Sequence, residues 1–132
     1  MKIGAVVPQG WVGEYDGWDP LDAWRRTTEV ARQADRLGFE SIWLFDHFHT
    51  VPRPTDEITF ESVTTLSALA ALTERVSLGH IVLGTASRNT ATTGRTPQHM
   101  GRVSGRQSEH RPAARRGATG GGHRTAEGRT RA

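Results

Sequence analysis

A continuous apolar run at residues 41–45, followed at once by two titratable residues, constrains the fold of this chain most strongly. The run, Ser-Ile-Trp-Leu-Phe, shows no polar/apolar alternation, and such runs are typical of strands buried on both faces of a parallel α/β sheet. Ligand sites in these folds lie beyond the carboxyl ends of the strands. Because Asp46 and His47 follow the run directly, the sequence predicts that they stand at a ligand site.

The flanking segments predict a β-α-β-α-β order. Residues 3–7 and 76–83 are further apolar strand candidates, and helices are expected from Asp19-Pro20 to Gly38 and over residues 60–73. Asp is a good helix cap, Pro suits the first helical position, and Gly suits the stop. Short connections make the strands parallel, with right-handed crossovers. The expected inner face of the first helix consists of Leu21, Trp24, Thr28, Ala31, Ala34 and Leu37, which recur at three- and four-residue steps.

The composition divides the chain after residue 89. Residues 1–89 contain every aromatic residue and carry a net charge of −4, whereas residues 90–132 carry +7 and contain only two large apolar residues, Met100 and Val103. A segment with so little apolar surface to bury cannot offset its chain entropy. We therefore expect an ordered α/β part at residues 1–89 and a disordered, Gly/Arg-rich basic tail at residues 90–132, without a third helix.

Absent features exclude several classes of protein. The chain has no cysteine, which excludes a disulfide framework and thiolate chemistry. It also lacks an apolar stretch of membrane-spanning length and a signal-peptide pattern at its amino terminus. These absences predict a cytoplasmic protein with no membrane partner.

Residues 46–49 offer two kinds of chemistry. His47 is a candidate general acid or base, and Asp46 could orient it or accept a hydrogen bond from a ligand; alternatively, Asp46 only caps the loop and His47 only packs at the strand end. His47 and His49, at strand spacing, could instead share a metal ion. Only His80 and scattered carboxylates would be left to complete such a set, so we expect no metal.

Five short motifs, in this order along the chain, are similar to those of a known family. They are Val7-Pro8-Gln9-Gly10-Trp11, Glu40-Ser41-Ile42-Trp43, Asp46-His47-Phe48-His49-Thr50-Val51-Pro52, Arg75-Val76-Ser77-Leu78-Gly79 and Arg88-Asn89. On these residues, segment 1–89 resembles the amino-terminal third of the luciferase-like monooxygenases. The third motif resembles most closely the F420-dependent oxidoreductases of the LLM class.

The resemblance implies a (β/α)8 TIM barrel, of which this chain holds the first βαβαβ units. It further implies coenzyme F420, or FMN as the alternative, bound at the carboxyl ends of the strands. Asp46 would then contact the cofactor, and His47 would act near its reactive face as an acid/base or polar stabiliser.

The same resemblance assigns further residues to the site. The end of the third strand would back the cofactor ring, with a non-prolyl cis peptide bond at Ile81–Val82. Apart from the resemblance, Trp11 lies on the loop after the first strand, which makes it a candidate pocket wall that should lie near Asp46 and His47. Trp11 and His49 are the expected residues of the substrate pocket. The complete set of expected site residues is Trp11, Asp46, His47, His49, Ile81, Val82, Leu83 and Gly84.

Two functions follow as hypotheses. The first is a flavin- or deazaflavin-dependent oxidoreductase that acts on a small organic molecule and is related to enzymes that form homo-oligomers. The second is a non-enzymatic α/β protein with a basic nucleic-acid-binding arm; it is weaker, because the tail has no aromatic side chain to stack on bases.

The length of the chain limits the first hypothesis. A TIM barrel needs about 250 residues, and strands four to eight have no counterpart in this sequence. We therefore expect a truncated, inactive fragment. The Arg, Gly, Ala and Thr content of residues 90–132 is typical of GC-rich DNA read out of frame, which suggests a frameshift after residue 89; sequencing the gene tests this.

Overall fold

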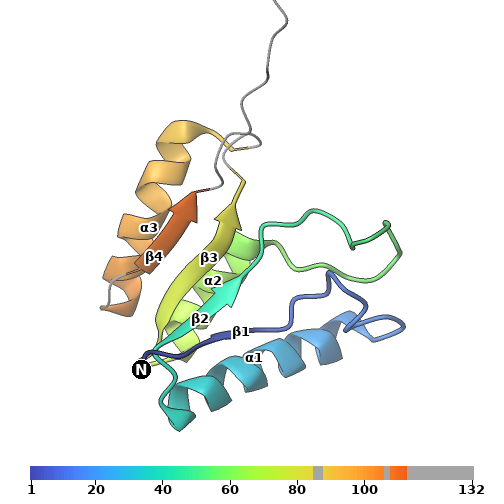
Figure 1. Cartoon of the computed structure of the whole chain (residues 1–132), viewed down its shortest axis with the longest axis horizontal. Coiled ribbons are helices and arrows are strands. Elements are labelled where there is room, and N and C mark those ends of the chain that lie inside the picture. Colours follow the sequence, from blue (N-terminus) through green and yellow to red (C-terminus); the bar gives the residue numbers. More distant parts are fainter. Residues whose placement is uncertain (85–87, 106–107, 113–132) are drawn as a thin grey trace, which may run out of the picture.

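The computed structural model describes residues 1–84, 88–105 and 108–112. These residues form one parallel sheet with strand order β1-β2-β3-β4, covered on one face by three helices that alternate with the strands along the chain (Figure 1). The α/β class and the parallel βαβαβ unit predicted from the sequence are confirmed. The elements are β1 (Gly4–Val6), α1 (Pro20–Leu37), β2 (Ser41–Leu44), α2 (Ser62–Leu72), β3 (Ser77–Leu83), α3 (Thr90–Ser104) and β4 (Ser108–Pro112).

Helix α1 begins and ends where its local sequence dictates. The Asp19 carboxylate accepts hydrogen bonds from the backbone N–H groups of Leu21 and Asp22, and Pro20 occupies the first turn. Gly38 closes the helix in the left-handed conformation with φ of 81°, where residues without a Cβ are favoured.

The expected inner face of α1 is only partly correct. Ala31 and Ala34 are buried as predicted, but Leu21 and Leu37 are 54% and 68% exposed. Ala23 and Thr27 are completely buried in their place. Small side chains let the helix lie close to the sheet, so the buried stripe follows the small residues and the two leucines are displaced to its margins.

The main core lies between the sheet and the helices. In-register residues of parallel strands point to the same side, and Ile42 pairs with Leu78 in this way. Both are buried against Leu66 and Leu69 of α2. Burial of this apolar surface is the main force that holds the helices on the sheet.

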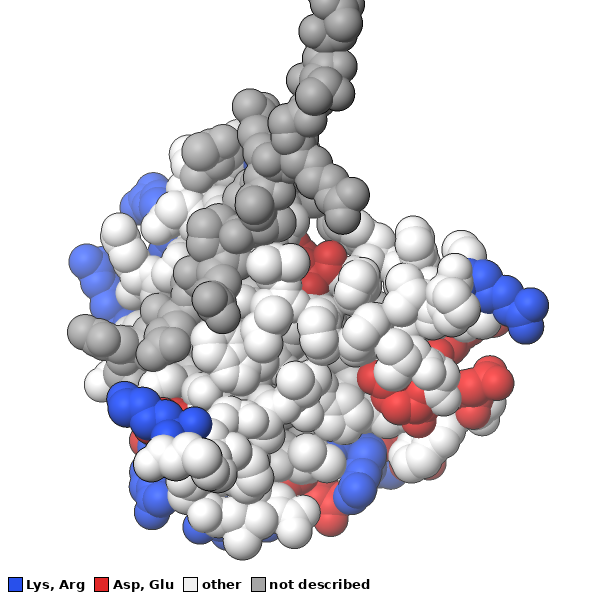
Figure 2. All heavy atoms as spheres, viewed as in Figure 1, with Lys and Arg blue, Asp and Glu red and all other residues white. Residues whose placement is uncertain are grey.

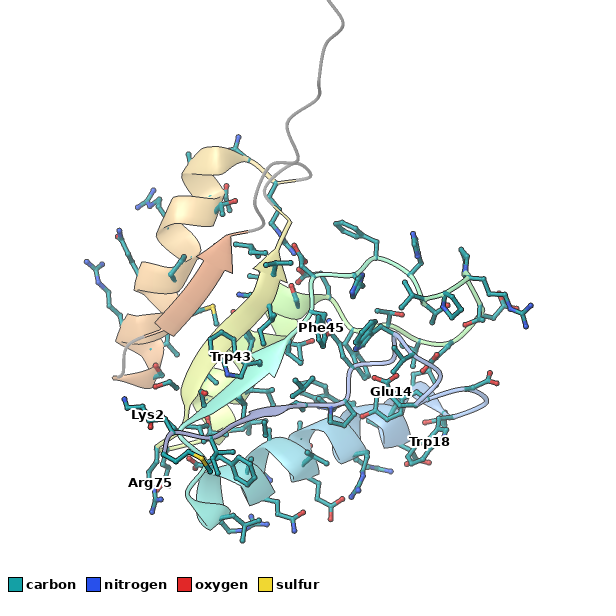
Figure 3. All side chains as sticks on the ribbon, in the orientation of Figure 1. Lys2, Glu14, Trp18, Trp43, Phe45 and Arg75 are labelled. Carbon is teal, nitrogen blue, oxygen red and sulfur yellow. The ribbon has the colours of Figure 1, made fainter. Side chains whose placement is uncertain are left out.

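The opposite face of the sheet carries Trp43, whose ring lies flat across the neighbouring strands (Figure 3). A Cβ on Gly79 would stand 2.3 Å from the Trp43 ring, and one on Gly4 would stand 2.6 Å from the indole nitrogen. Val6, in register with Trp43, is 50% exposed on this face. In Figure 2 the Lys, Arg, Asp and Glu side chains lie mainly around the rim of this face.

Residues 90–112 differ from the expectation of a disordered tail. They form α3 and β4, and β4 pairs in parallel with β3. The Asn89 side chain caps α3 by accepting from the N–H groups of Ala91 and Thr92, and Met100 is 3% exposed in the core. One cap and one buried apolar residue therefore anchor a helix that average composition did not predict. Residues 113–132 of the expected tail lie outside the described residues.

Among the described residues, no helix is long and apolar enough to cross a membrane.

Candidate functional site

The carboxyl ends of β1, β2 and β3 bring three loop segments together. The segments are residues 9–15 after β1, residues 45–60 after β2, and Gly84 with Arg88 after β3. Gln9 ties the first two together: its buried side-chain amide donates to the Phe45 and Phe60 carbonyls at 2.8 and 2.6 Å, and its Oε1 accepts from the Phe45 N–H at 3.0 Å. This clamp continues the β1–β2 pairing past the ends of the strands.

Asp46, the first residue of the expected site, is the centre of a hydrogen-bond network. Its side chain is 3% exposed. Oδ2 accepts from the Gly84 N–H at 2.8 Å and from Arg88 Nε at 3.0 Å, while Oδ1 accepts from Ser62 Oγ at 2.8 Å and from Arg88 Nη2 at 2.5 Å. The carboxylate therefore joins the ends of β2 and β3 to the beginning of α2.

Arg88 also binds a second carboxylate. Its Nη2 donates to Glu61 Oε1 at 2.5 Å. Glu61 is the N-cap of α2 and accepts from the N–H groups of Val63 and Thr64. One guanidinium thus pairs with two carboxylates from different elements, an arrangement that arginine's planar set of donors permits.

The network shifts the pKa values of its members. Burial raises the pKa of the Asp46 carboxyl, but the hydrogen bonds from Arg88, Ser62 and the Gly84 N–H outweigh burial and lower it to about 2. The pKa of Glu61 is also lowered to about 2, because hydrogen bonds from Arg88 and the α2 amino terminus outweigh its burial. The hydrogen bonds that Arg88 donates to Asp46 and Glu61 raise its pKa. All three groups are ionised at neutral pH.

His47 and Trp11 form a stacked pair beside this network. Their ring centroids are 4.6 Å apart and their planes are inclined by 15°. Phe45 completes a cluster of three rings, with its centroid 4.3 Å from that of Trp11. The expectation that Trp11 lies near His47 is confirmed, and both rings remain partly accessible.

The end of β3 has the expected backbone feature. The Ile81–Val82 peptide bond is cis, and the Val51–Pro52 bond in the loop after β2 is also cis. Val82 is 45% exposed and Ile81 is half-buried, but the Leu83 side chain is 3% exposed. Of the four residues expected to back a ring, Ile81 and Val82 present accessible surface, Leu83 is in the core and Gly84 binds Asp46.

His49 and His80 do not join His47. His49 is exposed, with Nδ1 3.2 Å from the Thr50 carbonyl oxygen, while His80 is fully buried and pairs in register with Leu44, whose side chain lies in the core on the helix side. Within the described ranges, no three His, Cys, Asp or Glu side chains come close enough to hold a metal ion. His47, His49 and His80 therefore do not form the metal site considered as an alternative in the sequence analysis.

A hollow of about 660 Å³ lies elsewhere, between α2 and α3. Its lining includes Val63, Ser67, Arg95, His99 and Met100. Asp46 and the ring cluster do not line it, but a smaller neighbouring hollow of about 270 Å³ shares Val63 with it and is lined by Arg88.

The sequence reasoning missed the partners of Asp46. Arg88 was noted only as part of a motif, and Glu61 and Ser62 were not identified. A usable signal was present: Arg88 follows the third strand, and the carboxyl ends of adjacent parallel strands meet at one edge of a sheet. A buried carboxylate expected at that edge needs a cation nearby.

Comparisons with known proteins identify relatives of this arrangement. The family model for luciferase-like monooxygenases matches residues 1–105, which extends the resemblance beyond residue 89. No curated protein matches the sequence.

Several solved structures share the fold. They include the FMN complex of the oxygenating constituent of 3,6-diketocamphane monooxygenase from Pseudomonas putida, with 14% identity, a TM-score of 0.66 and coverage of 86% of this chain and 29% of that one. An F420-dependent secondary alcohol dehydrogenase in complex with an F420–acetone adduct has 19% identity, a TM-score of 0.66 and coverage of 85% and 31%. The monooxygenase RslO1 from Streptomyces bottropensis has 22% identity, a TM-score of 0.68 and coverage of 83% and 32%. This chain spans about a third of the length of each.

Proposed function

Because the chain belongs to the luciferase-like monooxygenase family, we propose that its carboxyl-end residues form the first part of a site for a flavin or deazaflavin coenzyme. The function is oxidoreduction of a small organic molecule, with coenzyme F420 as the proposed cofactor and FMN as the alternative. The solved structures with this fold include one that contains FMN and one that contains F420, and they support both coenzymes equally.

The observation that carries the proposal is the meeting of polar and apolar groups at one sheet edge. A titratable ring, His47, stands against Trp11, and the half-accessible Ile81–Val82 segment lies at the end of the adjacent strand. A flat coenzyme ring has an apolar face that needs such a wall and a reactive edge that needs a proton donor or acceptor. The residues present therefore fit the group.

The residues have different proposed tasks. When bound, the coenzyme would exchange a hydride with the substrate or, in its reduced form, activate oxygen. Ile81 and Val82 support one face of its ring, and His47 exchanges or stabilises a proton on the substrate side as a general acid/base. Trp11 and His49 line the substrate side, His49 from its exposed position in the loop after β2.

Asp46 takes an indirect part in this proposal. Its two oxygens already accept four hydrogen bonds from the protein, so its contribution is to fix the Gly84 N–H and with it the end of β3. We expect Asp46→Ala to weaken coenzyme binding because the supporting strand end loses its anchor.

The activity belongs to a complete barrel. Within the described ranges the sheet has four parallel strands, and the family fold closes eight. We propose that this chain alone is inactive and that the remaining strands supply the other coenzyme contacts.

A chimera tests the proposed function. Residues 1–89 of this chain, which include Arg88 as the partner of Asp46, would replace the matching segment of the F420-dependent secondary alcohol dehydrogenase. Coenzyme binding and alcohol oxidation would be assayed with F420 and, separately, with FMN. We expect a folded chimera that binds one of the two coenzymes and turns over. A folded chimera that binds neither would contradict the proposal.

A further inference from the structure

The loop between β1 and α1 folds around the side chain of Glu14 (Figure 3). Glu14 Oε1 accepts from the N–H groups of Gln9 and Gly10 at 3.1 and 2.9 Å, and Oε2 accepts from those of Trp11 and Val12 at 3.1 and 2.8 Å. Four successive backbone donors therefore converge on one carboxylate. An ionised carboxylate, which only accepts hydrogen bonds, can satisfy them all.

The same loop carries Trp11, the ring that stacks on His47. Both backbone polar groups of Trp11 are engaged: its N–H binds Glu14, and its carbonyl accepts from the Val51 N–H at 2.8 Å. These two hydrogen bonds fix the backbone on both sides of the Trp11 Cα, and the fixed backbone in turn positions the indole. Of these two contacts, the one to Glu14 depends on a side chain.

The turn leaves little room for another arrangement. Gly10 has φ of 84°, and a Cβ at this position would stand 1.8 Å from the Ile58 carbonyl oxygen. Thr59 Oγ1 donates to the Gly10 carbonyl, and the Phe60 N–H donates to the Gln9 carbonyl at 2.9 Å. The loop is thus held against residues 58–60 on one side and closed by Glu14 on the other.

From these contacts we propose that Glu14 is a positioning residue, whose carboxylate gathers the N–H groups of residues 9–12 and thereby holds Trp11 flat against His47. Any effect of Glu14 on catalysis rests on the proposed function, whereas its effect on the stacking of Trp11 against His47 does not. Glu14 itself has no catalytic part, because its two oxygens already accept four backbone hydrogen bonds.

Burial raises the pKa of Glu14, but the backbone hydrogen bonds outweigh burial and lower it below the ordinary value. The carboxylate is therefore ionised at neutral pH, as the four contacts require. In Glu14→Gln the side-chain NH2 group would replace one of the two oxygens. It would then point at backbone N–H groups that it cannot accept from, so the loop would lose two of its four hydrogen bonds to residue 14 and move away from it.

Nuclear magnetic resonance of the full chain, with the histidine rings isotope-labelled, tests the proposal. Protons over an indole face resonate upfield, so the His47 ring protons should lie upfield of those of the exposed His49. Trp11→Leu and Glu14→Gln should both move the His47 signals to the His49 range. Glu29→Gln, the same chemical change at an exposed α1 residue paired with Arg26, should leave them in place.

The outcomes separate clearly. A folded Glu14→Gln variant whose His47 signals stay upfield would overturn the proposal, as would a wild-type chain whose His47 signals match those of His49. If Glu14→Gln does not fold, Glu14→Asp replaces it, because a shorter carboxylate reaches fewer of the N–H groups and should move the signals part of the way; unmoved signals there would also overturn the proposal.

The kinetic consequence is read separately in the chimera. Glu14→Gln should lower kcat with little change in the KM of the coenzyme, since the coenzyme wall at Ile81–Val82 is untouched. An inactive chimera with the expected His47 shifts in the full chain would refute the proposed function and leave the positioning role of Glu14 intact.

Discussion

Asp46 and Arg88, 42 positions apart, form a two-point ion pair in which Nε donates to Oδ2 at 3.0 Å and Nη2 donates to Oδ1 at 2.5 Å. Because Asp46 is almost completely buried and Arg88 is one-fifth exposed, the pair is poorly screened by solvent. It joins the end of β2 to the residue just before the α3 cap, which makes it the main polar connection across the candidate site.

Removal of Arg88 should destabilise the chain strongly. Arg88→Ala leaves the Asp46 charge buried without its cation, and breaking such a pair typically costs about 3–5 kcal/mol. Urea unfolding followed by circular dichroism measures the loss. Arg25→Ala is the matched control: its partner Asp22 and Arg25 itself are 59% and 68% exposed, and such surface pairs contribute less than about 1 kcal/mol.

The same carboxylate predicts an acid-sensitive fold. The folded-state pKa of Asp46 is about 2, below the value of about 3.9 in unfolded chains. Its contribution, roughly 2 kcal/mol, is therefore fully present above about pH 5 and is lost as the pH falls toward 2. Thermal unfolding from pH 2 to pH 7 should show this loss, and Asp46→Asn should flatten the profile; an unchanged slope in that variant would show that Asp46 is not the group responsible.

Gly79 should not tolerate a side chain. In Gly79→Ala the new methyl group would overlap the Trp43 ring, and overpacking of this kind typically costs about 1–3 kcal/mol. The double variant with Trp43→Leu should recover part of that loss, because the clashing ring is gone. Independent, additive effects of the two changes in urea unfolding would contradict the contact.

Gly94 should respond in the opposite direction. It lies inside α3 with open space around its Cα, and glycine within a helix is less stable than alanine by about 0.5–1 kcal/mol. Gly94→Ala should therefore increase helical circular dichroism and stability. Gly13→Ala is the contrasting control, since it also meets no atom within 4 Å but has φ of 92° and should lose stability; no effect at Gly94 would argue that residues 90–104 are not helical.

Local signals in the sequence predicted most of the first three strands and two helices. The Asp19 cap, Pro20 and the Gly38 stop act within one helical turn of their positions, so they are readable from neighbouring residues alone. The start of α2 was less accurate: the helix was expected from residue 60, but it begins at Ser62 with Glu61 as its cap.

Contacts between distant residues were harder to predict. The placement of Trp11 near His47 was predicted from its position on the loop after the first strand, and the cis bond at Ile81–Val82 was predicted from the family resemblance. Both are confirmed. The Asp46–Arg88–Glu61 network and the hydrogen bonds from residues 9–12 to Glu14 connect specific atoms. The periodicity of apolar residues in the sequence does not predict such bonds. Helix α3 was not predicted because the expectation rested on the low apolar content of residues 90–132 as a whole. The helix is stabilised locally, by the Asn89 cap and by the burial of Met100.

The proposed frameshift stays a prediction. The gene would support it if the alternative frame after codon 89 encodes a continuous barrel sequence.

The turnover of His47→Ala in the chimera tests the central claim most directly, namely that the ring stacked on Trp11 performs acid/base chemistry on the bound substrate. A positioned acid or base typically contributes a factor of about 10²–10⁴ to the rate, so kcat should fall by that factor while coenzyme binding is retained. A folded His47→Ala chimera with the kcat of its parent would contradict the account and would leave His47 as a packing residue at the end of β2.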